Sequence, residues 1–136
     1  MPAQHHIDNE KKLLITRWEG DAEELPCTEA LQEYQRSIQS NPDYLGYNEI
    51  FDTCGANRIK VSISGLIRIG RIASKTDHLF TDKKLAIVVR SNVAFSILQM
   101  YESYRNIGIT SPKKIRIFKS FEKATEWARE DLKQTV

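Results

Sequence analysis

The sequence predicts an α/β protein with a small mixed, mostly parallel sheet of about five strands. Two observations lead to this prediction. Short apolar segments with the composition of strands alternate with longer segments in which apolar residues recur every three to four positions, as on one face of a helix. The resulting order is β-β-α-β-α-β-α-β-α, and such alternation implies parallel pairing through right-handed crossovers.

The first two strands are expected at Gln4–Asp8 and Leu13–Glu19. The residues between them are polar and prone to turns, so these strands should form a hairpin. Because hairpin strands are antiparallel, the first strand should lie at an edge of the otherwise parallel sheet. The second strand begins with three consecutive apolar residues, as a strand buried on both faces requires.

Three further strands are expected at Tyr47–Phe51, Lys84–Val89 and Ile115–Phe118. The second of these is a nearly continuous apolar run, which is typical of a central parallel strand. Lys113, Lys114 and Arg116 surround the start of the last strand. Charges at these positions indicate an edge strand, because lysine discourages pairing with another sheet.

The four helices are expected at Thr28–Ser40, from Ser62 or Ser64 to about Thr76, from Ser91 or Asn92 to Tyr104 or Asn106, and after Ser120. Each start holds a polar residue that can accept a hydrogen bond from the free amides of the first turn. The second helix has a broad apolar stripe from Ile63 to Ala73. Its opposite face holds a basic stripe, formed by Arg68, Arg71 and Lys75.

Length and composition indicate one domain over residues 1–136, since the chain has no linker rich in Pro, Gly or Ser. Its 40% hydrophobic and 28% charged residues are typical of globular proteins and argue against disorder. Cys27 and Cys54 belong to no metal or redox motif and are expected to be reduced. No signal segment or apolar run of about 20 residues is present. A cytoplasmic location is therefore expected.

Charge is distributed unevenly along the chain. Residues 1–50 hold 4 Lys/Arg against 10 Asp/Glu, whereas residues 51–136 hold 16 against 8. This asymmetry could mark an anion-binding face, or two solvated surfaces of one folded body. Nucleic-acid binding is not expected, because the pI of about 8.5 is modest and no aromatic residues interleave with the basic ones.

Four segments in this order resemble the SpoIIAA-like family, which is related to STAS domains and is also compared with CRAL-TRIO lipid-transfer folds. The segments are Ile15–Gly20, Glu49–Asp52, Lys84–Val89 with the Met100-Tyr101-Glu102 helix that follows, and Ile117–Trp127. The resemblance covers about residues 4 to 130. It implies a small sheet with helices packed mainly on one face, and it does not imply one activity.

The chain departs from the family at a position that matters for regulation. STAS anti-sigma-factor antagonists carry a phosphorylated serine at the start of the second helix, in a pattern resembling Asp-Ser-Ser-Gly-Leu. The matching stretch here is Ser62-Ile63-Ser64-Gly65-Leu66. Isoleucine occupies the acceptor position and cannot take a phosphate, so the family's switch would have to use one of the adjacent hydroxyls, on Ser62 or Ser64.

Eight residues are candidates for binding a ligand or a partner. They are Asp52, Ser62, Ser64, Arg68, Arg71, Lys75, Tyr101 and Tyr104. Asp52 is expected at the C-terminal end of a strand, where open α/β sheets bind ligands, so it could bind a cation or a substrate hydroxyl. It could equally accept hydrogen bonds from the amides of its own loop.

The other candidates also have two interpretations. The two serines could help to hold an anion at the helix start, or they could simply cap it. The basic stripe could meet an acidic protein or a lipid headgroup, or remain a solvated helix face. The two tyrosines could line an apolar pocket beside the second helix, or pack in the core.

No catalytic motif is present, neither a nucleophile elbow nor a phosphate-binding or dinucleotide-binding loop. Neither a metal nor a cofactor is expected. We therefore expect a non-enzymatic binding module that engages a protein partner or a small apolar or anionic ligand through the second and third helices. One alternative is a regulatory partner switch controlled by serine phosphorylation. Another is an unidentified enzymatic activity that involves Asp52.

Overall fold

The computed structural model describes residues 2–80, 82–106 and 113–130. Within these ranges, five strands form the main sheet, in the order β1-β2-β4-β6-β7. Their bounds are β1 Ala3–Asp8, β2 Leu13–Glu19, β4 Asn48–Gly55, β6 Lys84–Val88 and β7 Lys114–Phe118. A separate parallel pair consists of β3 (Ala22–Glu23) and β5 (Ile59–Lys60).

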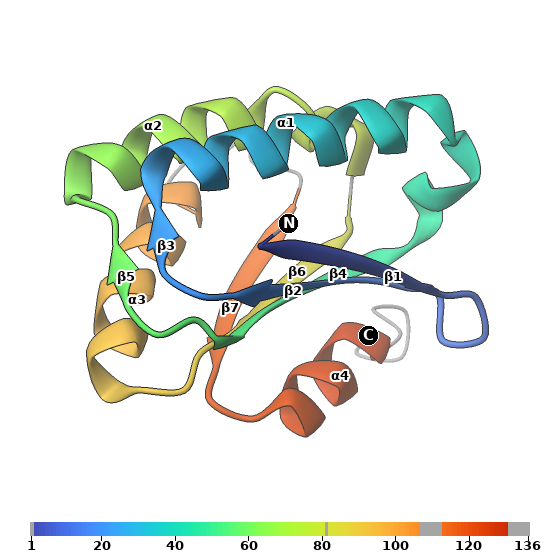
Figure 1. Ribbon diagram of the computed structural model, residues 1–136. Coiled ribbons are helices and arrows are strands. Elements are labelled where there is room, and N and C mark those ends of the chain that lie inside the picture. Colours follow the sequence, from blue (N-terminus) through green and yellow to red (C-terminus); the bar gives the residue numbers. More distant parts are fainter. Residues whose placement is uncertain (1, 81, 107–112, 131–136) are drawn as a thin grey trace.

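The described residues also form four α-helices and two short 3₁₀ helices. The α-helices are α1 Glu24–Ser40, α2 Ile63–Ser74, α3 Asn92–Asn106 and α4 Phe121–Arg129. The 3₁₀ helices are η1 Pro42–Gly46 and η2 Asp77–Phe80. Helices α1, α2 and α3 lie on one side of the sheet and α4 on the other (Figure 1).

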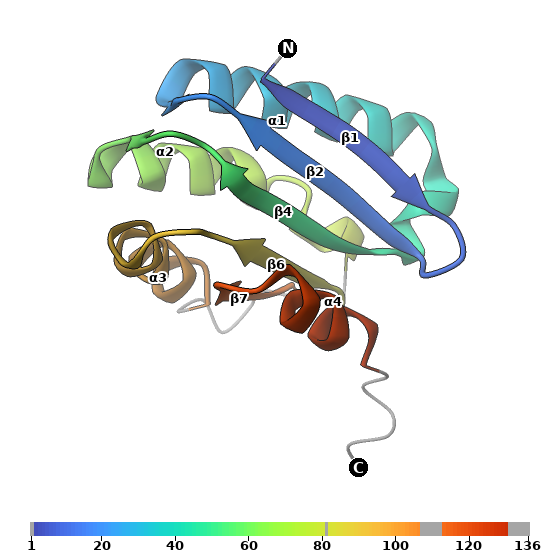
Figure 2. The same cartoon turned by 60° about the horizontal axis from the view of Figure 1, so that its bottom comes forward.

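The strand order explains why three helices share a face. β1 pairs antiparallel with β2, and β2, β4, β6 and β7 are parallel neighbours in chain order. Each crossover therefore steps one strand in the same direction, and right-handed crossovers place α1, α2 and α3 on the same face (Figure 2). The predicted α/β fold, with its antiparallel edge strand and helices mainly on one face, is confirmed.

Alternate residues of the strands face the two layers. Toward α4 the core joins strand and helix residues of one cluster, namely Leu13, Ile15, Ile50, Ala86, Val88, Phe118, Ala124 and Ala128. Toward α2 and α3 a second cluster contains Leu66, Ile87, Val89, Leu98, Tyr101, Ile115 and Ile117. The sheet is thus buried on both sides over its central strands.

Three predicted helix starts carry a serine cap. Ser62 Oγ accepts from the amide of Gly65 at 3.0 Å, which caps α2. Ser91 Oγ and Ser120 Oγ accept from amides three residues further on, at 3.0 and 3.2 Å. The cap pattern therefore located these three helix starts correctly.

The prediction that α1 begins at Thr28 is wrong, because the helix begins at Glu24. Pro26 lies in the first turn of this helix. Proline fits the first turn of a helix, since the amide that it lacks would have no partner there in any case. No side chain caps this helix start.

The prediction that β4 ends near Phe51 is also wrong. The strand runs to Gly55, which pairs with Glu19 of β2 beyond an irregularity in the register. A Cβ atom at Gly55 would lie 2.5 Å from the Trp18 carbonyl oxygen. Only glycine permits this close approach, so the glycine belongs to the strand pairing and not to a loop.

Candidate binding cavity

A cavity of about 180 Å³ lies between the sheet and helices α1 and α2, with α3 at one side. Most of its wall is apolar and includes Leu14, Trp18, Leu31, Ile69, Leu85 and Leu98. For comparison, an engineered cavity of about 150 Å³ with a similar wall binds benzene. The space is therefore the size of one ring.

Small helix residues leave this space open. Cys27 and Ala30 of α1 and Ala73 of α2 all line the cavity. Larger side chains from the same layer, such as Trp18 and Tyr34, extend between sheet and helices. Because the long side chains hold the helices away from the sheet, the short ones beside them cannot fill the gap.

One part of the cavity wall is polar and centres on Glu49, which is 5% exposed. The Tyr34 hydroxyl of α1 donates to Glu49 Oε2 at 2.6 Å. The Lys113 ammonium, just before β7, forms an ion pair with Glu49 Oε1. Burial raises the pKa of Tyr34 well above its usual range, and the Glu49 charge adds to this effect, so the hydroxyl stays protonated.

A second ion pair involves Arg105, which also lines the cavity. Arg105 of α3 donates through Nη2 to both carboxylate oxygens of Asp77, at 2.5 and 2.7 Å, and through Nη1 to the Tyr101 hydroxyl at 2.8 Å. Arg105 and Asp77 are 5% and 6% exposed. Burial raises the pKa of Tyr101. Each charge on this part of the wall is therefore matched by an opposite one.

The cavity approaches the surface between β1 and α1. A second hollow there, of about 290 Å³, shares Ala3, His5 and Ala30 with the cavity, and Glu29 and Glu33 lie on its rim. The His5 ring lies 5.3 Å from the Tyr34 ring, centroid to centroid, and its Nδ1 is 2.8 Å from Thr16 Oγ1. Partial burial lowers the pKa of His5, against the opposing charge of Glu33. His5 therefore lines both the hollow and the cavity, and its lowered pKa favours the neutral imidazole.

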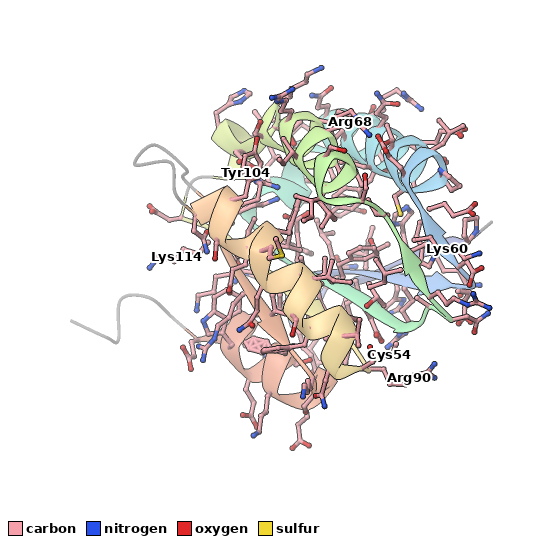
Figure 3. All side chains as sticks on the ribbon, turned by 90° about the vertical axis from the view of Figure 1, so that its left-hand side faces the viewer. Cys54, Lys60, Arg68, Arg90, Tyr104 and Lys114 are labelled. Carbon is pink, nitrogen blue, oxygen red and sulfur yellow. The ribbon has the colours of Figure 1, made fainter. Side chains whose placement is uncertain are left out.

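The two tyrosines among the eight candidates occupy different places. Tyr101 is buried and lines the cavity, together with Ile69 of α2. Tyr104 is 38% exposed, and it lies on α3 next to α2 (Figure 3). A Cβ atom at Gly70 would lie 2.7 Å from its ring, so this glycine allows the close contact between the two helices.

The basic stripe does not form a single charged surface. Arg68 donates to both carboxylate oxygens of Glu24, at 2.6 and 2.7 Å, and so joins α2 to the start of α1 (Figure 3). Arg71 and Lys75 are exposed. The pair with Glu24 is itself partly solvated, so its contribution to stability is small.

Asp52 and the two serines lie apart from the cavity. Asp52 shares the α4 side of the sheet with Ile50, where it accepts from the Cys54 amide at 2.9 Å and lies 3.6 Å from Arg17 Nε. Ser62 caps α2, and its Oγ is 3.2 Å from that of Ser64. Of the eight candidates, the structure therefore brings Tyr101 to the cavity and leaves the other seven outside its wall.

Sequence reasoning missed the polar residues of the cavity wall. Glu49 directly precedes the apolar Ile50 and Phe51 in β4, and Arg105 follows Tyr101 by one helical turn. These are weak local signals. From the sequence, Lys113 is expected to be an edge charge. β7 is indeed an edge strand, but Lys113 is only 7% exposed, because Glu49 draws its ammonium inward.

Two kinds of feature are absent from the described parts of the chain. No three His, Cys, Asp or Glu side chains come together as a metal site would require. Nor does any helix there have the length and hydropathy needed to cross a membrane.

No protein-family model matches the chain, and neither does any curated protein. Among solved structures, the chain is similar to an uncharacterised protein of the DUF3478 family from Shewanella loihica PV-4, which has a SpoIIAA-like fold. The identity is 12%, the TM-score is 0.60, and the match covers 93% of this chain and 91% of the other. The likeness establishes the fold alone: the chain has a SpoIIAA-like fold.

Proposed function

We propose that the protein is a non-enzymatic binding module that holds a small ligand in the cavity beneath α1, α2 and α3. A SpoIIAA-like fold is compatible with a STAS-type binding or regulatory module. The observation that carries the proposal is an apolar cavity of ring size with a few convergent polar groups, which is the usual composition of small-molecule sites.

The absence of catalysis is part of the proposal. General acid–base chemistry needs a titratable group that is positioned toward the substrate and ready to exchange a proton. In this wall Glu49 is engaged by Tyr34 and Lys113, and Arg105 by Asp77. Burial raises the pKa of the Cys27 thiol to about 11, so the nucleophilic thiolate is scarce at neutral pH.

The direct test is to fill the cavity. In Ala73→Leu, the new side chain would occupy space that lies beneath α2. Ser74→Leu adds the same side chain one residue later, on the exposed face of the same helix. We expect benzene, titrated into the purified chain and followed by NMR shifts of cavity residues, to bind the wild type and Ser74→Leu but not Ala73→Leu. Equal binding of benzene to all three proteins would mean that benzene binds outside the cavity, and would contradict the proposal.

The alternative function, a switch controlled by serine phosphorylation, has one structural observation in its favour. Ser64 is exposed, and its neighbour Ile63 keeps 58% of its surface accessible, so both are open to a kinase and a partner protein. Ser62 is less suited, because its hydroxyl caps α2. Mass spectrometry of the protein from its native cells, under several growth conditions, should find phosphate on Ser64 if this alternative holds. Absence of phosphate under all conditions would reject it.

A further inference from the structure

We infer that the cavity takes a neutral molecule with an apolar body of about one ring and a hydroxyl or N–H group that donates a hydrogen bond to the Glu49 carboxylate. This inference rests on the proposed function, because it assigns a chemical class to the ligand of the same cavity. Three features of the wall lead to it: its charge balance, its size and the hydrogen-bonding capacity of Glu49.

The charge balance of the wall selects a neutral ligand. Glu49 pairs with Lys113, and Arg105 pairs with Asp77, so neither side chain offers an uncompensated charge. His5, at the mouth, is neutral near pH 7 because burial lowers its pKa. A charged ligand would lose its hydration on entry without gaining a counter-ion, and this loss is costly in an apolar space.

The volume limits the ligand to about one ring. The cavity measures about 180 Å³, and a cavity of about 150 Å³ is enough for benzene. One ring with a small substituent, or a short branched aliphatic chain, fills such a space. A long-chain lipid does not fit within it.

Glu49 determines which polar group the ligand must carry. A carboxylate only accepts hydrogen bonds, and its two oxygens offer about four lone-pair positions. Tyr34 donates to Oε2, and Lys113 contacts Oε1, so the carboxylate keeps accepting capacity within the cavity wall. A ligand with only acceptors, such as an ether, would place its lone pairs against these oxygens.

The Tyr101 hydroxyl is the competing anchor, because it also lines the cavity. It accepts from Arg105 and could donate to a ligand that carries only acceptors. Hydrogen bonds to an ionised acceptor are roughly twice as strong as bonds between neutral groups. Glu49 should therefore dominate, and a donor on the ligand should matter more than an acceptor.

Four probes of similar size test this assignment by titration of the intact purified chain, followed by calorimetry or NMR. Benzene has no polar group, phenol is a donor, anisole is an acceptor only, and benzoate is an anion. We expect phenol to bind about 10-fold tighter than benzene and anisole, in line with a hydrogen bond to a charged group. Benzoate should not bind measurably.

Two variants connect the preference for phenol to Glu49. Tyr34→Phe leaves both ion pairs in place and frees a lone pair on Glu49 Oε2, so the preference for phenol over benzene should persist or grow. The double variant Glu49→Leu with Lys113→Met replaces the ion pair by apolar side chains of similar volume, which buried pairs generally tolerate. In this variant phenol and benzene should bind equally.

The outcomes separate the two proposals. If benzene binds but phenol and anisole bind no better, or if benzoate binds best, the assigned ligand class is wrong and the cavity still functions as a binding site. If the double variant keeps the phenol preference, Glu49 is not the anchor and the inference is overturned. If none of the four probes binds, the proposed function fails, and this inference fails with it.

Discussion

The two faces of the sheet use buried lysines in different ways. On the α4 side, Lys84 is 2% exposed, and its ammonium donates to the carbonyls of Trp127 and Glu130 at the end of α4, at 2.8 and 3.2 Å. On the other side, Lys113 forms an ion pair with Glu49 in the wall of the cavity. Lys84 satisfies the free carbonyls of a helix end, which is a structural task. A buried lysine therefore does not by itself indicate a binding site. Whether its role is structural or belongs to a site depends on the groups that it contacts.

Packing differs between the faces for a related reason. Ala124 and Ala128 of α4 are 0% and 1% exposed, because this short helix lies directly on the strands. Ala30 and Ala73, on the other face, line an opening instead. Alanine brings a helix close only where no longer neighbour holds it away, and Trp18, with 1% exposure, is such a neighbour.

The largest effect should come from breaking the cavity ion pair on one side only. Glu49→Ala leaves the Lys113 ammonium buried without its carboxylate, and such losses cost about 3–5 kcal/mol of unfolding free energy. Replacing both partners, by Glu49→Leu with Lys113→Met, should change stability by much less. Urea denaturation measures both variants. A single variant as stable as the double one would show that the pair is solvated and not part of a closed wall.

Adding a leucine should have opposite consequences on the two faces. Ala128→Leu forces extra volume into the closed α4 layer and should cost about 1–3 kcal/mol. Ala73→Leu places the same side chain in the cavity, and filling a cavity commonly adds about 0.5–2 kcal/mol. Thermal and urea denaturation compare the two. Equal destabilisation would mean that the cavity face is as tightly filled as the other.

The two cysteines offer a built-in comparison of access. Burial raises the pKa of both thiols to about 11, so their intrinsic reactivities should be similar. Cys27 lines the cavity, whereas Cys54 packs against the α4 cluster. Saturating phenol should slow alkylation of Cys27 by iodoacetamide several-fold and leave Cys54 unchanged, as peptide mass spectrometry would measure. Equal slowing would indicate general stabilisation and not occupancy of the cavity.

The smallest effect concerns pH at the mouth of the cavity. Burial lowers the pKa of His5 in the folded protein, so the unfolded chain binds the proton more tightly. The contribution of neutral His5 to the free energy of unfolding is therefore complete above about pH 6.5, the usual histidine pKa, and is lost as the pH falls below that value. The wild type should lose more stability than His5→Gln between pH 7 and 5.5. An equal loss of unfolding free energy in the two proteins between pH 7 and 5.5, measured by denaturation at each pH, would contradict this expectation.

Local sequence signals located the parts of the fold that depend on local physics. The serines that cap α2, α3 and α4 marked those helix starts, because capping involves residues only three positions apart. The continuous apolar run of Lys84–Val89 marked a central strand, and the polar turn marked the hairpin. The start of α1 escaped prediction because Pro26 is compatible both with a loop and with a first helical turn.

By itself the sequence determined the order of the main strands and helices along the chain. The layers depend on the order of the strands in the sheet, because right-handed crossovers between neighbouring parallel strands place α1, α2 and α3 on one face. Only the tertiary structure decided which charged residues meet. Glu49 and Lys113 come from different strands, and Tyr34 reaches them from a helix. No local sequence pattern predicts these contacts, because they join residues that are distant in sequence and that only the strand order of the sheet brings together. The cavity is decided in the same way, by long and short side chains from distant segments that the fold brings into one layer.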